Sequence, residues 1–230
     1  MTPRLQALAF CALLAGCSSP SAVAYGEQLF NDPQFAGSQF NVWSCATCHA
    51  TRAGDTRILP GANLTHSVNR ASFYGGKEAR LIDAVSFCYV YFMRGPGPLE
   101  PDEAHSKALY EYLASLGTTQ SAALPMTLVL ATEEVPRGDK ARGEEVYRKA
   151  CHTCHGEVKT GQGQNSVLAS KLPNVADEYP ALFPGIAPSL VFIEKIRHGQ
   201  FFKVGGNMPF FSKESMSDED VGALLTYLGQ

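Results

Sequence analysis

The 230-residue sequence has little excess of charge of either sign, with 19 basic and 22 acidic side chains and a formal net charge of −3. Such a chain does not carry the basic surface that nucleic acid requires, so we expect no nucleic-acid partner. Paired carboxylates and nucleophile–base arrangements are not recognisable either, which argues against acid–base catalysis. After the first residues, no apolar run is long enough to cross a bilayer.

The N-terminal residues predict export. Arg4 precedes the apolar run "LQALAFCALLAG", and small residues follow it. This run is too short for a lasting membrane span, so we expect a signal peptide over residues 1–16.

The segment from Leu14 to Cys17 resembles the lipobox of bacterial lipoproteins. That resemblance implies cleavage before Cys17, a lipid on its sulfur that attaches the protein to a membrane, and a tether over residues 17–24. Ser18 in place of aspartate implies the outer membrane rather than the inner one. The alternative is an ordinary secretory leader cut near Ala24, which would discard Cys17.

Four of the seven cysteines form two C-x-x-C pairs, each followed at once by histidine: "CATCH" at 45–49 and "CHTCH" at 151–155. This is the attachment signature of c-type haem, in which two thiols bond to the porphyrin and the histidine binds iron. A zinc ribbon would need its pairs about 15 to 20 residues apart, and a thioredoxin-like motif would need a βαβ pattern. The sequence therefore predicts two covalently bound haems, held by Cys45, Cys48, His49, Cys151, Cys154 and His155.

The surroundings of the two motifs repeat. Ahead of each motif, a glycine is followed four residues later by an aromatic residue, in "GEQLF" and "GEEVYRKACHTCHG". Each half closes with an amphipathic stretch that begins with acidic residues, "PDEAHSKALYEYLASL" and "SDEDVGALLTYLGQ", as helix starts prefer.

This arrangement resembles the class I cytochrome c domain, in which a glycine and an aromatic residue on the first helix pack against an aromatic residue on the last. The resemblance implies an all-α fold of two tandem class I cytochrome c-like domains, each a few helices wrapped around one covalently bound haem. We expect haem 1 in residues 25–129 and haem 2 in residues 130–230, with a Pro-, Thr- and Ala-rich connector over residues 117–139. The matching residues are Gly26, Phe30 and Tyr112 in one half and Gly143, Tyr147 and Tyr227 in the other.

For haem 2, Met208 lies between Gly-Gly-Asn and proline, where class I cytochromes place the distal ligand. A soft thioether suits iron, although a methionine can also fill a gap in a core. We expect Met216 to be packing and His198 to end its helix. In this family a proline carbonyl orients the haem histidine, and Pro60 and Pro188 are the candidates.

For haem 1, two sulfurs compete as the distal ligand. Cys88 shares a helix face with Leu81, Val85 and Phe92, at three- and four-residue spacing. Met93 lies about 140° around a continuous helix from Cys88, so both sulfurs could face one iron only if the helix ended between them.

A second resemblance bears on this choice. "SCATCHA", "LPGANL" and a helix ending in cysteine with methionine five residues later resemble the haem-thiolate cytochromes of sulfur oxidation, which include the Sox cytochrome and thiosulfate dehydrogenase. The resemblance implies that Cys88 binds haem 1 as a thiolate opposite His49, and that Met93 stays unbound. The alternatives are Met93 as ligand with Cys88 as a small buried hydrophobe, and His66 as a third candidate.

These observations predict a periplasm-facing, lipid-anchored di-haem cytochrome that relays electrons between redox partner proteins. A thiolate stabilises ferric iron, so we expect a low potential at haem 1 and a high potential at haem 2. The alternative is an oxidoreductase acting on thiosulfate or a related sulfur anion at haem 1, with Cys88 and Arg94 as catalytic residues and Arg52 and Arg57 as further cations. A di-haem peroxidase is a third option, but the chain looks short for one.

Overall fold

The computed structural model describes residues 20–165, 167, 169–173, 183–199 and 208–230. Cys17 and the expected signal peptide lie outside the described residues. Within the described ranges the chain is helical, and its only β-type pairings are two isolated bridges, which confirms the expected all-α class. None of these helices has the length and apolar character that crossing a membrane requires. The helices are α1 (Ala22–Asn31), α2 (Cys45–Cys48), η1 (Ser67–Asn69), η2 (Tyr74–Gly76), α3 (Leu81–Tyr91), α4 (Ala104–Ser115), α5 (Lys140–Val146), the π-helical η3 (Tyr147–Cys151), α6 (His152–His155), α8 (Pro188–His198) and α9 (Asp218–Leu228).

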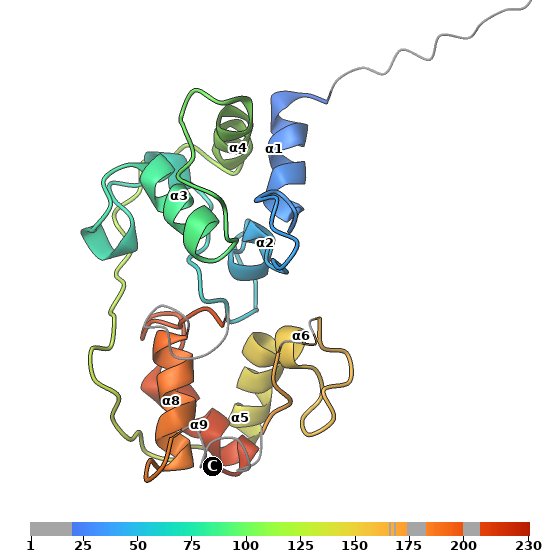
Figure 1. The fold of residues 1–230 in the computed structure, drawn as a ribbon. Helices are drawn as coiled ribbons and strands as arrows, with labels where there is room; N and C mark the ends of the chain where they lie inside the picture. The colour runs from blue at the N-terminus through green and yellow to red at the C-terminus, as the bar shows by residue number, and fades with distance from the viewer. Residues whose placement is uncertain (1–19, 166, 168, 174–182, 200–207) are drawn as a thin grey trace, which may run out of the picture.

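The buried apolar residues form two clusters, one in each half of the chain. In Figure 1 the segment from α1 to α4 occupies the upper part of the molecule and the segment from α5 to α9 the lower part. The upper cluster contains Leu29, Phe30, Leu99, Ala108, Leu109, Tyr112 and Leu113. The lower cluster contains Val146, Tyr147, Cys151, Phe192, Ile193, Ile196, Phe211, Met216, Val221, Leu224, Leu225 and Leu228.

In the upper half, α1 packs on α4 at a glycine. A Cβ atom on Gly26 would lie 2.0 Å from the carbonyl oxygen of Ala108, so a side chain larger than hydrogen does not fit between the two backbones. One turn further along, the rings of Phe30 and Tyr112 meet with centroids 5.2 Å apart. The predicted contact of glycine and aromatic residue with the last helix is confirmed in this half.

The lower half repeats this crossing between α5 and α9. A Cβ atom on Gly143 would lie 2.0 Å from the carbonyl oxygen of Ala223, and the rings of Tyr147 and Tyr227 have centroids 5.7 Å apart. The two halves therefore use one packing solution twice, as the repeated sequence predicts.

The helix ends follow their capping residues. Ser21 accepts a hydrogen bond from the amide of Ala24, so α1 begins at Ala22, inside the segment that we expected to be tether. Ser217 caps α9 in the same way, and the acidic residues of "SDED" fill its first turn as predicted. In α4 the acidic residues instead precede the helix, because Glu103 is its N-cap residue and Ala104 its first.

A buried guanidinium fixes the segment between α8 and α9. Arg197, at 2% exposure, donates to the carbonyl oxygens of Phe211 (3.1 Å) and Met216 (2.8 Å) and to a carboxylate oxygen of Asp218 (2.7 Å). Because these partners satisfy the charge, it can stay buried, and it holds the residues that follow Met208 against α8.

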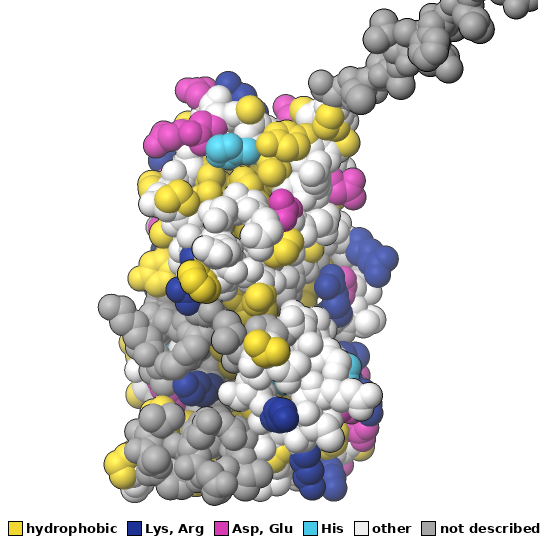
Figure 2. All heavy atoms as spheres, turned by 45° about the vertical axis from the view of Figure 1, so that its right-hand side comes forward, with side chains coloured by type: hydrophobic (Ala, Val, Ile, Leu, Met, Phe, Trp, Pro, Cys, Tyr) yellow, Lys and Arg dark blue, Asp and Glu magenta, His cyan; other side chains and the backbone are white. Residues whose placement is uncertain are grey.

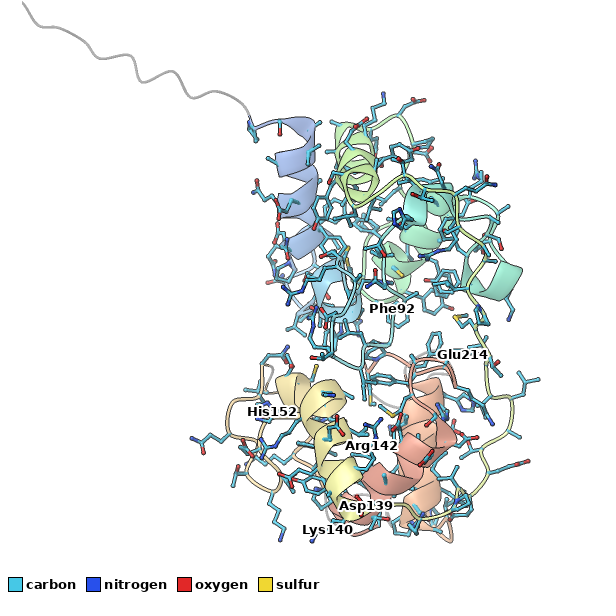
Figure 3. The ribbon with its side chains drawn as sticks, turned by 180° about the vertical axis from the view of Figure 1, so that it is seen from behind. Phe92, Asp139, Lys140, Arg142, His152 and Glu214 are labelled. Carbon is cyan, nitrogen blue, oxygen red and sulfur yellow. The ribbon has the colours of Figure 1, made fainter. Side chains whose placement is uncertain are left out.

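Ion pairs cover the exposed side of α5. Arg142 lies 2.7 Å from Asp220 on α9 and 2.9 Å from Glu145, and Lys149 lies 2.6 Å from Glu145. Figure 3 labels Arg142 on this helix. On the face shown in Figure 2, most acidic side chains lie in the upper part, and most basic ones lie along the right side and in the lower part. The exposed ion pairs on α5 contribute little to stability.

The connector (residues 117–139) is bonded to both halves. Ser121 pairs with the upper half, donating to the carbonyl of Asn69 and accepting from the amide of Ala71. Thr127 donates from its amide (2.8 Å) and its hydroxyl (2.6 Å) to the carboxylate of Glu214 in the lower half. Figure 1 shows this segment running along the side of the molecule from α4 to α5.

We predict that Gly26→Ala lowers the free energy of unfolding by about 2 kcal/mol, because the added methyl group meets the backbone of α4, which cannot move aside cheaply. Gly97→Ala is the control, since a Cβ atom there meets no atom of the described residues within 4 Å. Denaturant unfolding of the two purified variants measures the difference. Equal midpoints and slopes would show that the helix crossing tolerates a side chain.

We also predict that the connector loosens in acid. Burial opposes ionisation of Glu214, but hydrogen bonds from Thr127, the backbone amide of Glu214 itself and the side chain of Ser212 together outweigh burial and lower the pKa of Glu214 to about 2. A depressed carboxyl pKa stabilises the contact above the ordinary value of 4.5, and this contribution is lost as the pH falls toward 2. The hydrogen-exchange protection factor of the Thr127 amide should therefore fall over this window.

At neutral pH, Glu214→Gln should lower the same protection factor, because the neutral amide is a weaker acceptor and has only one acceptor oxygen. Glu133→Gln is the matched control, because Glu133 is an exposed carboxylate on the connector itself. Unchanged protection of Thr127 in Glu214→Gln would rule out this contact as the anchor of the connector.

Candidate haem sites

The first C-x-x-C-H motif lies on a short helix with a loop folded against it. Cys45 and Cys48 are the ends of α2, and His49 follows as its C-cap residue. The loop returns alongside the motif, and the amide of Gly61 donates to the carbonyl of Cys48 (3.0 Å). A backbone hydrogen bond therefore ties the loop to the motif.

This loop also orients the His49 ring. Nδ1 lies 2.7 Å from the carbonyl oxygen of Ala62, so it carries the proton and leaves Nε2 as the atom that can bind iron. A Cβ atom on Gly61 would come within 2.4 Å of the ring, so glycine is needed beneath the imidazole. The orienting carbonyl is not that of Pro60, the sequence candidate, but lies two residues further on.

The second motif repeats this contact with different surroundings. The helix changes to π-helical turns over η3, which ends at Cys151, and α6 then carries Cys154 and His155. Nδ1 of His155 lies 2.7 Å from the carbonyl oxygen of Ser170. Pro188, the sequence candidate for this role, is instead the first residue of α8. A π-helical turn next to a ligand-bearing segment is typical of functional sites.

Both histidines are set up as neutral ligands. Burial lowers the pKa of His49; the hydrogen bond to Ala62 opposes this shift and the charge of Arg70 adds to it. Burial also lowers the pKa of His155, and the hydrogen bond to the carbonyl of Ser170 opposes this shift. An uncharged imidazole with its Nδ1 proton engaged is the form that coordinates iron through Nε2.

The four motif thiols are free in the structure. Burial raises the pKa of Cys45 and of Cys151 to about 12 and that of Cys154 to about 11. For Cys48, burial and then the neighbouring Cys88 raise the pKa further, and Cys154 of the other motif adds to the effect.

A cavity of about 560 Å³ opens beside the first motif and is lined by Cys45, Cys48 and His49. Its walls are mostly apolar and come from α1, α3, α4 and the loops between them. The connector and the lower half contribute as well, through residues that include Met126 and Phe210. Figure 3 labels Phe92 and Glu214, two lining residues at the junction of the halves. Further apolar lining residues are Phe30, Phe35, Trp43, Leu59, Leu81, Val85, Leu109 and Leu113.

Both candidate sulfurs for haem 1 line this cavity. The predicted face is confirmed, because Leu81, Val85 and Phe92 line it together with Cys88. Helix α3 ends at Tyr91, so Met93 lies beyond the helix and is not held about 140° away from Cys88. Met93 is 3% exposed. The geometry therefore allows either sulfur to serve as the distal ligand. The sequence predicts that this helix ends at Cys88, whereas it ends three residues later, at Tyr91.

A contact with Tyr74 distinguishes Cys88 from Met93. Its hydroxyl oxygen lies 2.9 Å from the sulfur of Cys88, and its ring meets that of Phe87 edge-on with centroids 5.0 Å apart. Burial, and then the nearby Cys88, raise the pKa of Tyr74 far above its ordinary range, so the hydroxyl keeps its proton. Burial also raises the pKa of Cys88 while the Tyr74 hydrogen bond opposes this shift. Nothing in the sequence near Cys88 indicates this partner, which lies 14 residues earlier.

Of the three predicted cations, only Arg57 lines the cavity, and Arg70, which was not predicted, lines it as well. Arg94 is exposed, and neither it nor Arg52 lines the cavity, whereas Arg57 and Arg70 do. Arg57 is paired with Asp55 at 2.7 Å. Arg70 donates one hydrogen bond to the carbonyl of Asn63, and its buried Nε atom has no hydrogen-bond partner among the described residues. No local pattern around Arg70 in the sequence reveals this position.

The other sequence candidates are placed as follows. Met208 packs against the lower cluster, which includes Cys151, while the glycine-rich loop before it lies outside the described residues. Met216, at 1% exposure, is packing as predicted. His198 ends α8 as predicted and lies 2.7 Å from Glu194.

His66 stands away from the cavity. It caps η1, its Nδ1 accepts from the amide of Thr119, and it is not among the residues that line the cavity. Cys88 and Met93 therefore stay as the two candidate distal ligands at the first motif.

The described residues fit a covalently bound haem. Free thiols one helical turn apart stand beside a histidine whose Nδ1 proton is engaged by a carbonyl, and at the first motif an apolar cavity adjoins them. Buried apolar walls exclude water and set the dielectric around an iron.

Comparison with known proteins agrees with this chemistry. Residues 138–228 match the family model described as cytochrome c oxidase, cbb3-type, subunit III. A thiosulfate dehydrogenase of Stutzerimonas stutzeri (strain A1501) is 27% identical over 153 residues, which cover 63% of this chain and 48% of that protein. This chain thus spans about half the length of that relative.

Among solved structures, a thiosulfate dehydrogenase from Marichromatium purpuratum in its as-isolated form matches with 22% identity and a TM-score of 0.39, covering 62% of this chain and 33% of that chain. The match of residues 138–228 to the cytochrome family model supports a covalently bound c-type haem and redox chemistry in that segment.

Proposed function

We propose that this chain is an exported di-haem c-type cytochrome that relays electrons between redox partner proteins. The observation that carries the proposal is the repetition of one site: each C-x-x-C-H histidine donates its Nδ1 proton to a backbone carbonyl at 2.7 Å, from Ala62 and from Ser170. When bound, each haem iron takes up and releases one electron. The protein's task is then to bury and orient the two groups.

We further propose His49 and Cys88 as the ligands of haem 1, and His155 and Met208 as those of haem 2. The hydrogen bond from Tyr74 supports Cys88, because an iron-bound thiolate is deprotonated and accepts such a donor. A thiolate donates charge to iron and a thioether does not, so haem 1 would have the lower potential. The amide of Ile58, in the loop after the first motif, donates to the carbonyl of Lys149, just before the second motif, and this contact supports transfer between the two sites.

The leader supports a location on the periplasmic side. We propose a lipid anchor on Cys17, with Ser18 favouring the outer membrane. The expected domain boundary at residues 129 and 130 also remains a proposal, supported by the two separate buried clusters.

A second candidate is oxidation of thiosulfate or a related sulfur anion at haem 1, with the electrons leaving through haem 2. It is favoured by the similarity to the thiosulfate dehydrogenase of Stutzerimonas stutzeri and by Arg57 and Arg70 at the cavity. Arg70 is the better anion partner, because Asp55 already neutralises Arg57.

We predict two haems per chain in the exported protein. Cys45→Ala/Cys48→Ala and Cys151→Ala/Cys154→Ala should each retain one haem, measured as pyridine haemochrome against protein concentration. Cys88→Ala is the control, since it removes a thiol from the same cavity and should retain both. One haem in the unaltered chain would contradict the di-haem proposal.

We predict that Cys88→Ala alone removes a thiolate signal from the EPR and near-infrared spectra of the oxidised protein, whereas Met93→Ala preserves it. The opposite pattern, with Cys88→Ala silent and Met93→Ala changed, would assign haem 1 to Met93.

Thiosulfate added to the oxidised protein then separates the two functions. If thiosulfate reduces the haems of the unaltered protein, and both Cys88→Ala and Arg70→Gln abolish this reduction, the oxidoreductase is favoured. If thiosulfate reduces neither haem, the relay is favoured.

A further inference from the structure

We propose that Tyr74 is a positioning residue for haem 1, whose hydroxyl donates a hydrogen bond to the Cys88 sulfur and thereby limits how much charge that sulfur gives to the iron. The inference rests on the proposed His49/Cys88 ligation. It adds a residue that no motif in the sequence indicates.

Once iron is bound, only one of the two residues can donate the hydrogen bond. The two atoms are 2.9 Å apart, and a coordinated sulfur has lost its proton, so the hydroxyl of Tyr74 must be the donor. Both residues line the cavity that adjoins His49. Because the surroundings are mostly apolar, the sulfur has few competing donors, and one hydrogen bond has a large effect on it.

The backbone holds Tyr74 in place under strain. Its φ angle is +48°, in the left-handed region that an aromatic residue rarely adopts. The flanking residues impose this conformation, since Phe73 exchanges backbone hydrogen bonds with Glu78 on the other side of the turn. Gly75 follows with a φ of +64° and lies against the backbone of Met126 in the connector. Strain of this kind persists where the surrounding structure fixes it, and it concentrates at functional sites.

Loss of the hydroxyl should leave the sulfur more electron-rich. A richer thiolate stabilises ferric iron more, so the potential of haem 1 should fall while that of haem 2 stays unchanged. We expect about a tenfold shift in the ferric-to-ferrous ratio of haem 1 at a fixed ambient potential, which is about 59 mV for one electron.

The test is a spectroelectrochemical titration of the full di-haem protein, comparing Tyr74→Phe with the unaltered chain. Phenylalanine keeps the ring that packs on Phe87 and removes only the hydroxyl. Tyr110→Phe is the matched control, because Tyr110 is 49% exposed on α4 and does not line the cavity. A lower haem 1 potential with a shifted but retained thiolate EPR signal in Tyr74→Phe alone supports the inference.

An unchanged potential and EPR spectrum in Tyr74→Phe would overturn it. If Tyr74→Phe fails to incorporate haem, the unaltered protein still decides the matter. Its iron–sulfur stretching frequency by resonance Raman should shift in D2O if an exchangeable proton bonds to the sulfur, and no shift would overturn the inference.

Cys88→Ala distinguishes this failure from failure of the proposed ligation. A thiolate signal that Cys88→Ala removes and Tyr74→Phe leaves unaltered defeats only the role of Tyr74. If Cys88→Ala is silent, the ligation proposal fails, and the inference about Tyr74 fails with it.

Discussion

Two close helix crossings hold this molecule together. At Gly26 and at Gly143, the backbone of a first helix touches a carbonyl of a last helix so closely that a Cβ atom would lie 2.0 Å away. In each half the first helix leads along the chain to the C-x-x-C-H motif, directly in the lower half and after a longer loop in the upper one. The crossing therefore sets where the thiols and the histidine stand relative to the core.

The two sites share their proximal side and differ in their surroundings. A backbone carbonyl engages each histidine in the same way, because a histidine needs only one acceptor at Nδ1 to present Nε2. At the first motif, Cys88, Met93 and a buried tyrosine hydroxyl line the cavity. Under the proposed di-haem assignment, the side of the first cavity that carries Cys88, Met93 and Tyr74 is where haem 1 would acquire its particular chemistry.

The first cavity is not completed by its own half. Residues of the connector and of the lower half line it, and the Phe92 and Phe210 rings meet across the junction with centroids 6.4 Å apart. Ile58 donates its amide to the carbonyl of Lys149 and packs against the lower cluster. Burial of the first site therefore depends on how the halves pack, which links its dielectric environment to the whole molecule.

The sequence by itself determined the features that local spacing encodes. These are the two attachment motifs, the all-helical class, the glycine–aromatic pairs and the face of α3 that carries Cys88, because each depends on residues a few positions apart. Only the tertiary structure decided which carbonyls orient the histidines, that Arg70 rather than Arg94 reaches the cavity, and that Tyr74 meets Cys88. Those contacts join segments whose approach is set by loop paths and by the end of α3, and neither has a periodic signature in the sequence.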